Sequence, residues 1–289
     1  MSGGGFRVSP PRVSPLATRA SRPPLEAAGS ADAYRQTSFV LGEEVELVID
    51  GLNLEGAIAE ASSGAKYRKQ QMVAALGLWS RAWLSRLEAL HAVEWGNYAA
   101  AVTLVRAAAD YQASALHVLR TGAAEWQEWL GGGGIAPAPD QHATEFRLHA
   151  FRAAEVLAAH EILGPIYRTA MDLSLSHFGS TLLVAGNESA PDRVLTTFGD
   201  RDFHLGLAEL HLGWLARLGI AQVDALREFE GVFAIPEPAK LDSWRARAAK
   251  LAARPDRCRV ETIERDGEKR YLVREWRREP RGAPKRLLL

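Results

Sequence analysis

The chain has 289 residues, of which 47% are hydrophobic and 24% charged, and its formal net charge at pH 7 is zero. This composition is typical of a soluble globular protein with one large or two small domains. The single cysteine, Cys258, excludes an intrachain disulfide and a multi-cysteine zinc site. No apolar run approaches the roughly 18 residues of a membrane span, and the first residues do not contain the hydrophobic stretch that is typical of a signal peptide. We therefore expect a cytoplasmic protein with no membrane contact.

Positive charge is concentrated at the two ends of the chain. Residues 245–289 contain 15 lysines and arginines against seven acidic residues, and residues 1–38 contain five against two. The intervening residues are acidic, because the whole chain sums to zero. The basic C-terminal tail could bind nucleic acid or an acidic partner, or it could fold back on the acidic body of its own chain. Both interpretations follow from the charge pattern.

The first 64 residues predict little helical structure. Residues 1–38 are rich in serine, proline, glycine and arginine and show no hydrophobic period, which predicts a disordered segment. Residues 39–64 form a strand and a linker in this interpretation. The run from Glu44 to Asp50 alternates between polar and apolar side chains, and Gly51 follows as a turn residue.

Residues 65–235 carry a helical hydrophobic period almost throughout, which predicts a helical bundle domain. Short connections containing glycine or proline separate the segments. Their expected ranges are 66–91, 98–120, 140 or 144 to 163, 165–184, 192–218 and 220–233. Five to six helices with short connections predict an all-α fold, an antiparallel up-and-down bundle, with a short N-terminal strand and a small C-terminal β-hairpin.

Residues 236–289 form a basic tail of different character. Pro236 and Pro238 interrupt the preceding helix, and a short helix is expected over 241–253. The alternating run 260–273 surrounds Asp266-Gly267, which is the strongest local hairpin signal in the chain. An isolated hairpin is marginally stable in water. We therefore expect it to pack on the body, to pair with the strand near Val48, or to mediate dimerisation.

Two mostly apolar helices each carry one line of polar side chains. On the first, Thr103, Arg106, Asp110, Ser114 and His117 recur at three- and four-residue spacing, and on the second Thr169, Asp172, Ser176 and Ser180 do so, beside His177. Two such lines could share a polar cleft. Its candidate residues are Arg106, Asp110, His117, Asp172, Ser176 and His177. Alternatively, both lines face solvent, or Arg106 and Asp172 form one buried ion pair that fixes the register of the helices.

The histidines do not show the spacing of a metal site. His142, His149 and His160 share one face with Glu145, and His204 and His211 share another, but the nearest pairs are at least seven residues apart. A helical zinc site uses histidines four residues apart, which is about one turn. Histidines seven residues apart are separated by two turns, or about 10 Å, which is too far for both to bind one ion. We therefore expect no metal and no cofactor.

The order of these residues resembles that of bacterial proteins with HEPN-like helical bundles. The resemblance rests on Arg106-Ala-Ala-Ala-Asp110, on Tyr167-Arg168 and on Ser174-Leu-Ser-His177, and it covers about 90 residues. It implies a bundle that is often dimeric, and thus a homo-oligomer. In some members it also implies a metal-independent endoribonuclease, with an arginine followed by four to six residues and a histidine.

This chain departs from the ribonuclease pattern at the residues that matter. Eight residues separate Arg168 from His177, whereas Arg86 and His91 have the expected spacing but lie on the first long helix. Two functions therefore remain open. The first is a non-enzymatic binding or regulatory module with a polar cleft between helices, and the alternative is a HEPN-like endoribonuclease.

Overall fold

The structure is a computed structural model that describes residues 9–14, 16–124, 127, 153–176, 178–186, 189, 192–276 and 286–288. These residues are mostly helical, which confirms a helical fold class. The longer helices are α1 (Ala28–Val40), α2 (Gly42–Ala61), α3 (Gln70–Glu94), α4 (Tyr98–Thr121), α10 (Leu205–Glu228) and α11 (Pro238–Ala252). The shorter ones are η1 (Ala65–Tyr67), α7 (Ala153–Ala159), α8 (Leu163–Ser174) and α9 (Phe178–Ala185).

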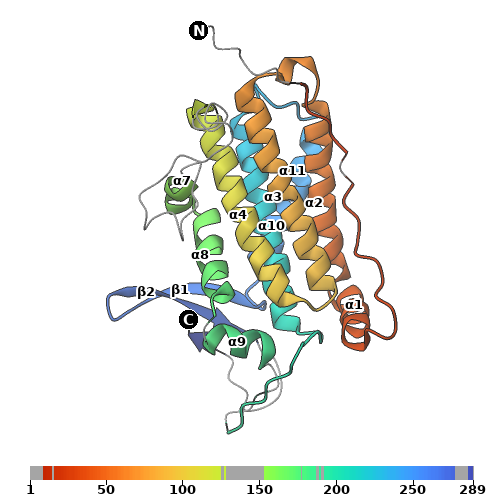
Figure 1. The fold of residues 1–289 in the computed structure, drawn as a ribbon, viewed down its shortest axis with the longest axis vertical. Helices are drawn as coiled ribbons and strands as arrows, with labels where there is room; N and C mark the ends of the chain where they lie inside the picture. The colour runs from red at the N-terminus through yellow and green to blue at the C-terminus, as the bar shows by residue number, and fades with distance from the viewer. Residues whose placement is uncertain are drawn as a thin grey trace.

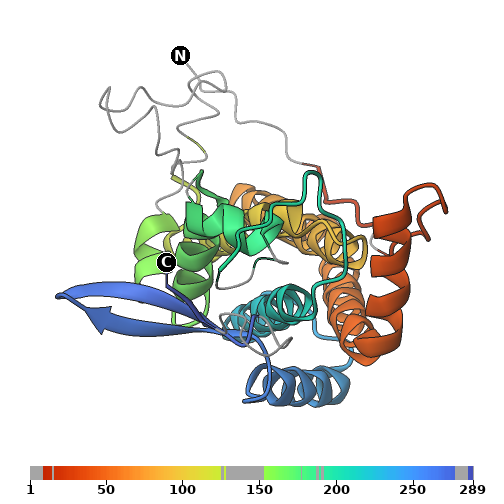
Figure 2. The same cartoon turned by 90° about the horizontal axis from the view of Figure 1, so that it is seen from below.

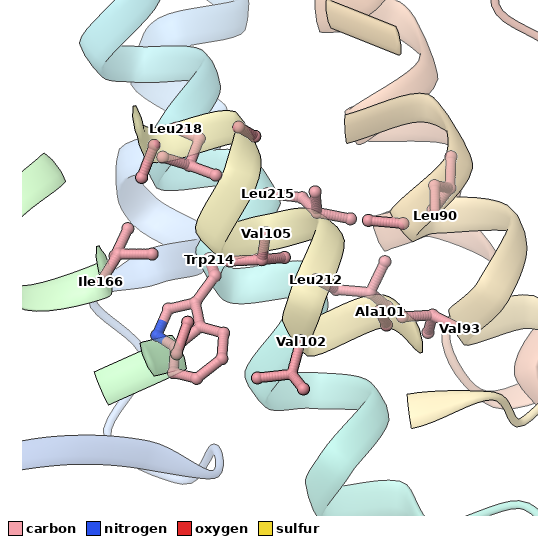
Figure 3. Close-up of a cluster of buried hydrophobic side chains, with 14 of the residues drawn as sticks. Leu90, Val93, Ala101, Val102, Val105, Ile166, Leu212, Trp214, Leu215 and Leu218 are labelled. Atoms are coloured by element: carbon pink, nitrogen blue, oxygen red, sulfur yellow. The ribbon is translucent and has the colours of Figure 1, made fainter. Parts of the chain in front are cut away.

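The helices α2, α3, α4, α10 and α11 run side by side, and α1 lies at one end of them (Figure 1). The helices α7 and α8 lie beside α4, and α9 contacts α8 and β3 (Figure 1). Helix α11 lies beside α10 at the edge of the bundle (Figure 2). Side chains of α3, α4, α8 and α10 interdigitate in the main core, where Val105, Leu212 and Leu218 are fully buried (Figure 3). Alanines such as Ala101 and Ala108 on α4 are also fully buried, so neighbouring helices approach closely.

The predicted strand from Glu44 to Asp50 is wrong, because these residues belong to α2. This helix contacts α3, α10 and α11, so apolar side chains are buried on several of its sides, among them Val45, Val48 and Ile49. A helix that is buried on several sides loses the single apolar stripe on which a periodicity argument depends. In the sequence alone, its short alternating run therefore resembles a strand.

The predicted disorder of residues 1–38 is also corrected where the structure describes them. Helix α1 begins at Ala28, and the preceding residues Ala17 and Ala20 are buried against the bundle. Composition could not predict that residues 17–20 are ordered, because side chains of α2 and α3, far away in the sequence, form hydrogen bonds with their backbone, as described below.

Two helix boundaries also differ from the predictions. The helix expected over 192–218 begins at Leu205, and it continues past Gly219 to Glu228 without the expected break. The helix expected over 165–184 is divided into α8 and α9. Gly219 serves helix packing instead of ending a helix: a Cβ atom there would lie 2.7 Å from the ring of Trp244.

Helix α11 is part of the core and not of a separate tail. The indole of Trp244 is 1% exposed, and its Nε1 donates a hydrogen bond of 2.8 Å to the Leu47 carbonyl of α2. Gly51 makes room for this ring, since a Cβ atom at that position would lie 2.3 Å from Trp244 Cζ2. The small residues Gly51 and Gly219 thus form the site on α2 and α10 that receives α11.

The predicted C-terminal hairpin is confirmed. Strands β1 (Arg259–Arg265) and β2 (Glu268–Arg274) pair antiparallel around Asp266 and Gly267, which have the positive φ values of 57° and 76° that a two-residue hairpin turn requires. A third strand, β3 (Arg286–Leu288), pairs with β2. The hairpin packs against α10 and extends away from the helices (Figure 2).

Candidate functional site

The two helices with polar lines, α4 and α8, pack against each other. Arg106, Asp110 and Asp172 are each partly buried, and Arg106 Nη1 donates to the Met171 sulfur at 3.1 Å. Burial raises the pKa of the Tyr167 hydroxyl, the charge of Asp110 raises this pKa further, and the charge of Arg106 opposes the shift. Tyr167, which sequence reasoning did not select, therefore belongs to the same polar environment as Arg106 and Asp110.

The other candidate cleft residues are more dispersed. His117 is three turns of α4 beyond Arg106, about 16 Å along the helix axis, and its Nε2 lies 3.2 Å from the Thr121 hydroxyl. Ser176 is exposed beyond the end of α8, and His177 lies outside the described residues. Among the described residues, Arg106, Asp110 and Tyr167 are therefore the polar groups that interact between α4 and α8.

A cavity of about 490 Å³ lies instead between α2 and α3, and we call it the α2–α3 chamber. Residues 11–14 pass over it. Its walls are mostly apolar and aromatic, and Gly77, Ser80 and Leu84 on its rim are exposed. The lining residues on the two helices are Glu55, Gly56 and Ala59 of α2 and Val73, Leu76, Gly77, Trp79, Ser80, Trp83 and Leu84 of α3.

The charged wall of the chamber is neutralised by a buried ion pair. Glu55 and Arg86 have side-chain exposures of 0% and 2%, and two hydrogen bonds of 2.7 and 2.5 Å join the guanidinium to the carboxylate. Trp79 Nε1 donates a third hydrogen bond, of 3.0 Å, to Glu55. Because all of these donors converge on one carboxylate, the helical wall presents no net charge to a ligand. The remaining charged lining residue is the exposed Arg12 of the segment that passes over the cavity.

Gly77 leaves open space on the chamber side of α3. A Cβ atom at this position would meet no atom within 4 Å, although a glycine in the interior of a helix costs roughly 0.5–1 kcal/mol relative to alanine. Close packing therefore does not account for this glycine, which lines the open side of the chamber.

The arginine and histidine with ribonuclease-like spacing bind different partners. Arg86 is buried against Glu55, whereas the His91 ring donates through Nε2 to the Thr18 carbonyl at 2.9 Å. Both side chains therefore make contacts within this chain. Glu55 and Arg86 were not selected from the sequence as a pair, although Glu55 was visible as a carboxylate in a run that is otherwise largely apolar.

The described histidines of the predicted metal-like arrangements have structural contacts. His160 Nδ1 accepts from the amides of Ile162 and Leu163 at the start of α8, and burial, then the charge of Arg120, lowers its pKa. Burial lowers the pKa of His211 to about 4. Within the described residues, no group of three or more histidine, cysteine or acidic side chains could hold a metal ion. His142, Glu145 and His149 lie outside those residues.

The described part of the basic C-terminal region folds back on the acidic body. Arg245 pairs with Asp224 of α10 at 2.6 Å, and Arg247 pairs with Asp50 of α2 at 3.1 Å. The buried guanidinium of Arg257 binds Glu44 and also donates to the Glu209 carbonyl at 2.8 Å. For these residues, the charge asymmetry of the sequence therefore serves intramolecular contacts.

Comparisons with family models, with curated proteins and with solved structures gave no match to this chain. Among the helices that the structure describes, none combines the length and apolar character that crossing a membrane requires.

Proposed function

We propose that the protein is a non-enzymatic binding module and that the α2–α3 chamber is its principal ligand site. The volume of about 490 Å³ carries this proposal, because it lies in the range of about 300–1,000 Å³ that is usual for small-molecule sites. The walls supply two indole rings, Trp79 and Trp83, and a neutralised ion pair. These features favour a neutral, mostly apolar ligand with a flat surface that can stack on an indole.

The polar line between α4 and α8 remains a second part of the proposed binding function. Arg106 and Asp110 supply opposite charges in a partly buried setting, which suits a polar or zwitterionic group. Two further expectations remain part of the proposal. The helices of each chain form an antiparallel up-and-down bundle, and the chain forms a homo-oligomer. The module is expected to act in the cytoplasm without a cofactor.

Gly77→Leu provides the direct test of the chamber. A Cβ atom at Gly77 meets no atom within 4 Å, so a leucine side chain can project from α3 into the chamber. Binding of a neutral apolar fluorophore such as Nile red should then be lost. The fold should remain intact, and its free energy of unfolding should rise by about 0.5–1 kcal/mol because a helical glycine has been removed. Titration of the fluorophore and urea unfolding measure the two effects.

Gly213→Leu is the matched control, because Gly213 also lies inside a helix, and a Cβ atom added there would meet no atom within 4 Å. It does not line the chamber and should leave fluorophore binding unchanged. Equal binding by the wild type and by Gly77→Leu would refute the chamber as the ligand site. Cleavage of total RNA by the purified wild type in the presence of a chelator would favour the HEPN-like endoribonuclease instead.

A further inference from the structure

A segment near the N-terminus lies across α2 and α3 in the manner of a bound peptide. We call residues 16–21 the N-terminal strap. Asn53 of α2 contacts both backbone groups of Ala17: its Oδ1 accepts from the Ala17 amide at 2.9 Å, and its Nδ2 donates to the Ala17 carbonyl at 3.0 Å. A side-chain amide that satisfies both groups of one residue binds an extended chain through its backbone.

Three further side chains repeat this mode of contact along the strap. His91 donates to the carbonyl of Thr18 at 2.9 Å, and Glu94 accepts from the amide of Ala20 at 2.8 Å. Trp95 Nε1 donates to the carbonyl of Ser21 at 2.9 Å. Main-chain hydrogen bonds of this kind supply affinity that depends little on the bound sequence.

Selectivity comes from one charged position and two small ones. Glu94 is fully buried, and its carboxylate receives Arg19 Nε at 2.8 Å in addition to the backbone amide. The Arg19 guanidinium also lies 5.4 Å from the centre of the Tyr34 ring. Ala17 and Ala20 are 2% and 4% exposed, so larger side chains would not fit at these positions. A buried carboxylate without a cation is costly, so the occupant must supply a cation there, as Arg19 does.

We propose that Asn53, His91, Glu94 and Trp95 form a peptide-binding groove and that the N-terminal strap is its internal occupant. The ligand class in trans is an extended segment of a partner protein, with an arginine at the position of Arg19 and small residues two positions before and one position after it. Residues 11–14 of the same segment line the α2–α3 chamber, so the chamber is tested on the uncut chain and the groove on the cut one. Each site can then fail without the other.

A short connection ties the strap to α1 and keeps its local concentration high. Residues 22–27 contain Pro23-Pro24 and the exposed side chain of Leu25, with 74% exposure. A tethered segment competes with a free peptide at an effective concentration in the millimolar range for a short linker. Binding of a partner segment is therefore measurable once this tether has been cut.

The experiment uses the full chain with a protease site inserted between Leu25 and Glu26, which is cleaved after folding. The cut segment should stay bound through gel filtration and should exchange with a labelled synthetic peptide of residues 9–24, followed by fluorescence anisotropy. Arg19→Gln in the peptide should weaken binding at least about tenfold, because it removes the charge-assisted hydrogen bond to Glu94. N-methylation of Ala20 should have an effect of similar size, because it removes a backbone donor.

Thr18→Ala is the matched control within the peptide, because the contact at Thr18 is made by its carbonyl and its side chain is exposed. Its affinity should stay within about twofold of the wild-type peptide, a difference well below 1 kcal/mol. These peptide variants leave the folding of the protein untouched. Loss of the segment on cutting with no saturable rebinding would overturn the proposal, as would equal affinity of the Arg19→Gln peptide. Strap exchange between uncut copies, seen as a dimer, would contradict the assignment to a separate partner protein.

Discussion

Breaking the ion pair between Glu55 and Arg86 should destabilise the protein far more than breaking an exposed one. The two side chains have exposures of 0% and 2%, so Arg86→Ala leaves an uncompensated carboxylate in the core. Losses of this kind are about 3–5 kcal/mol. Urea unfolding, followed by the helical circular dichroism signal, should show the midpoint moving to lower concentration by the corresponding amount.

The same chain contains an exposed ion pair for comparison. Arg120 and Glu228 are 46% and 43% exposed and are joined by two hydrogen bonds of 2.8 and 2.7 Å. Arg120→Ala should therefore cost less than about 1 kcal/mol. The double variant Glu55→Leu, Arg86→Met should recover part of the lost stability, because an apolar pair of similar volume needs no counterion, whereas Trp79 Nε1 loses its acceptor. Equal losses for Arg86→Ala and Arg120→Ala would refute the argument that burial makes the Glu55 contact costly to break.

Three further predictions concern pH, packing and the polar line. The folded pKa of His211, about 4, lies below the ordinary value, so the stability linked to this residue is complete above about pH 6.5 and falls by roughly 3 kcal/mol as the pH is lowered to about 4. His211→Phe should flatten this part of the pH dependence of urea unfolding, and an unchanged slope would contradict the assignment. Gly51→Ala should lower the free energy of unfolding by about 2–3 kcal/mol because its methyl group would overlap Trp244, whereas a loss below about 1 kcal/mol would show that α11 shifts freely. Arg106→Ala should lower the urea-derived stability by no more than about 1 kcal/mol, since this cation is only partly buried, and a loss of about 3 kcal/mol or more would place it in a buried network.

The sequence predicted elements whose signals are local. Asp266-Gly267 identified the hairpin because these residues readily adopt the required positive φ values. The helix expected from residue 98 begins there as α4, where the side chain of Asn97 accepts a hydrogen bond from the Ala100 amide. Such signals need only a few neighbouring residues and can be recognised without knowledge of the tertiary fold.

Elements that depend on distant partners could not be predicted in the same way. The order of the strap at Ala17 is supplied by Asn53, 36 residues later, and the role of Gly51 becomes apparent only when Trp244 is placed beside it. The polar line on α4 showed which of its residues share a face of the helix. The expectation that α4 and α8 lie together agrees with the contact between these helices. The polar line could not show that a cavity lies between α2 and α3, because a cavity depends on the tertiary arrangement of both walls.

The position of Trp244 also has a consequence for folding during synthesis. The hydrogen bond from its indole to Leu47 spans 197 residues, so helix α2 leaves the ribosome long before the ring that covers Gly51 exists. At about 5–20 residues per second, that interval is roughly 10–40 s. During this time the apolar surface around Val48 and Leu52 has no α11 to cover it. A nascent chain that stalls before residue 244 should therefore expose this surface to chaperones, whereas release of the completed chain should hide it.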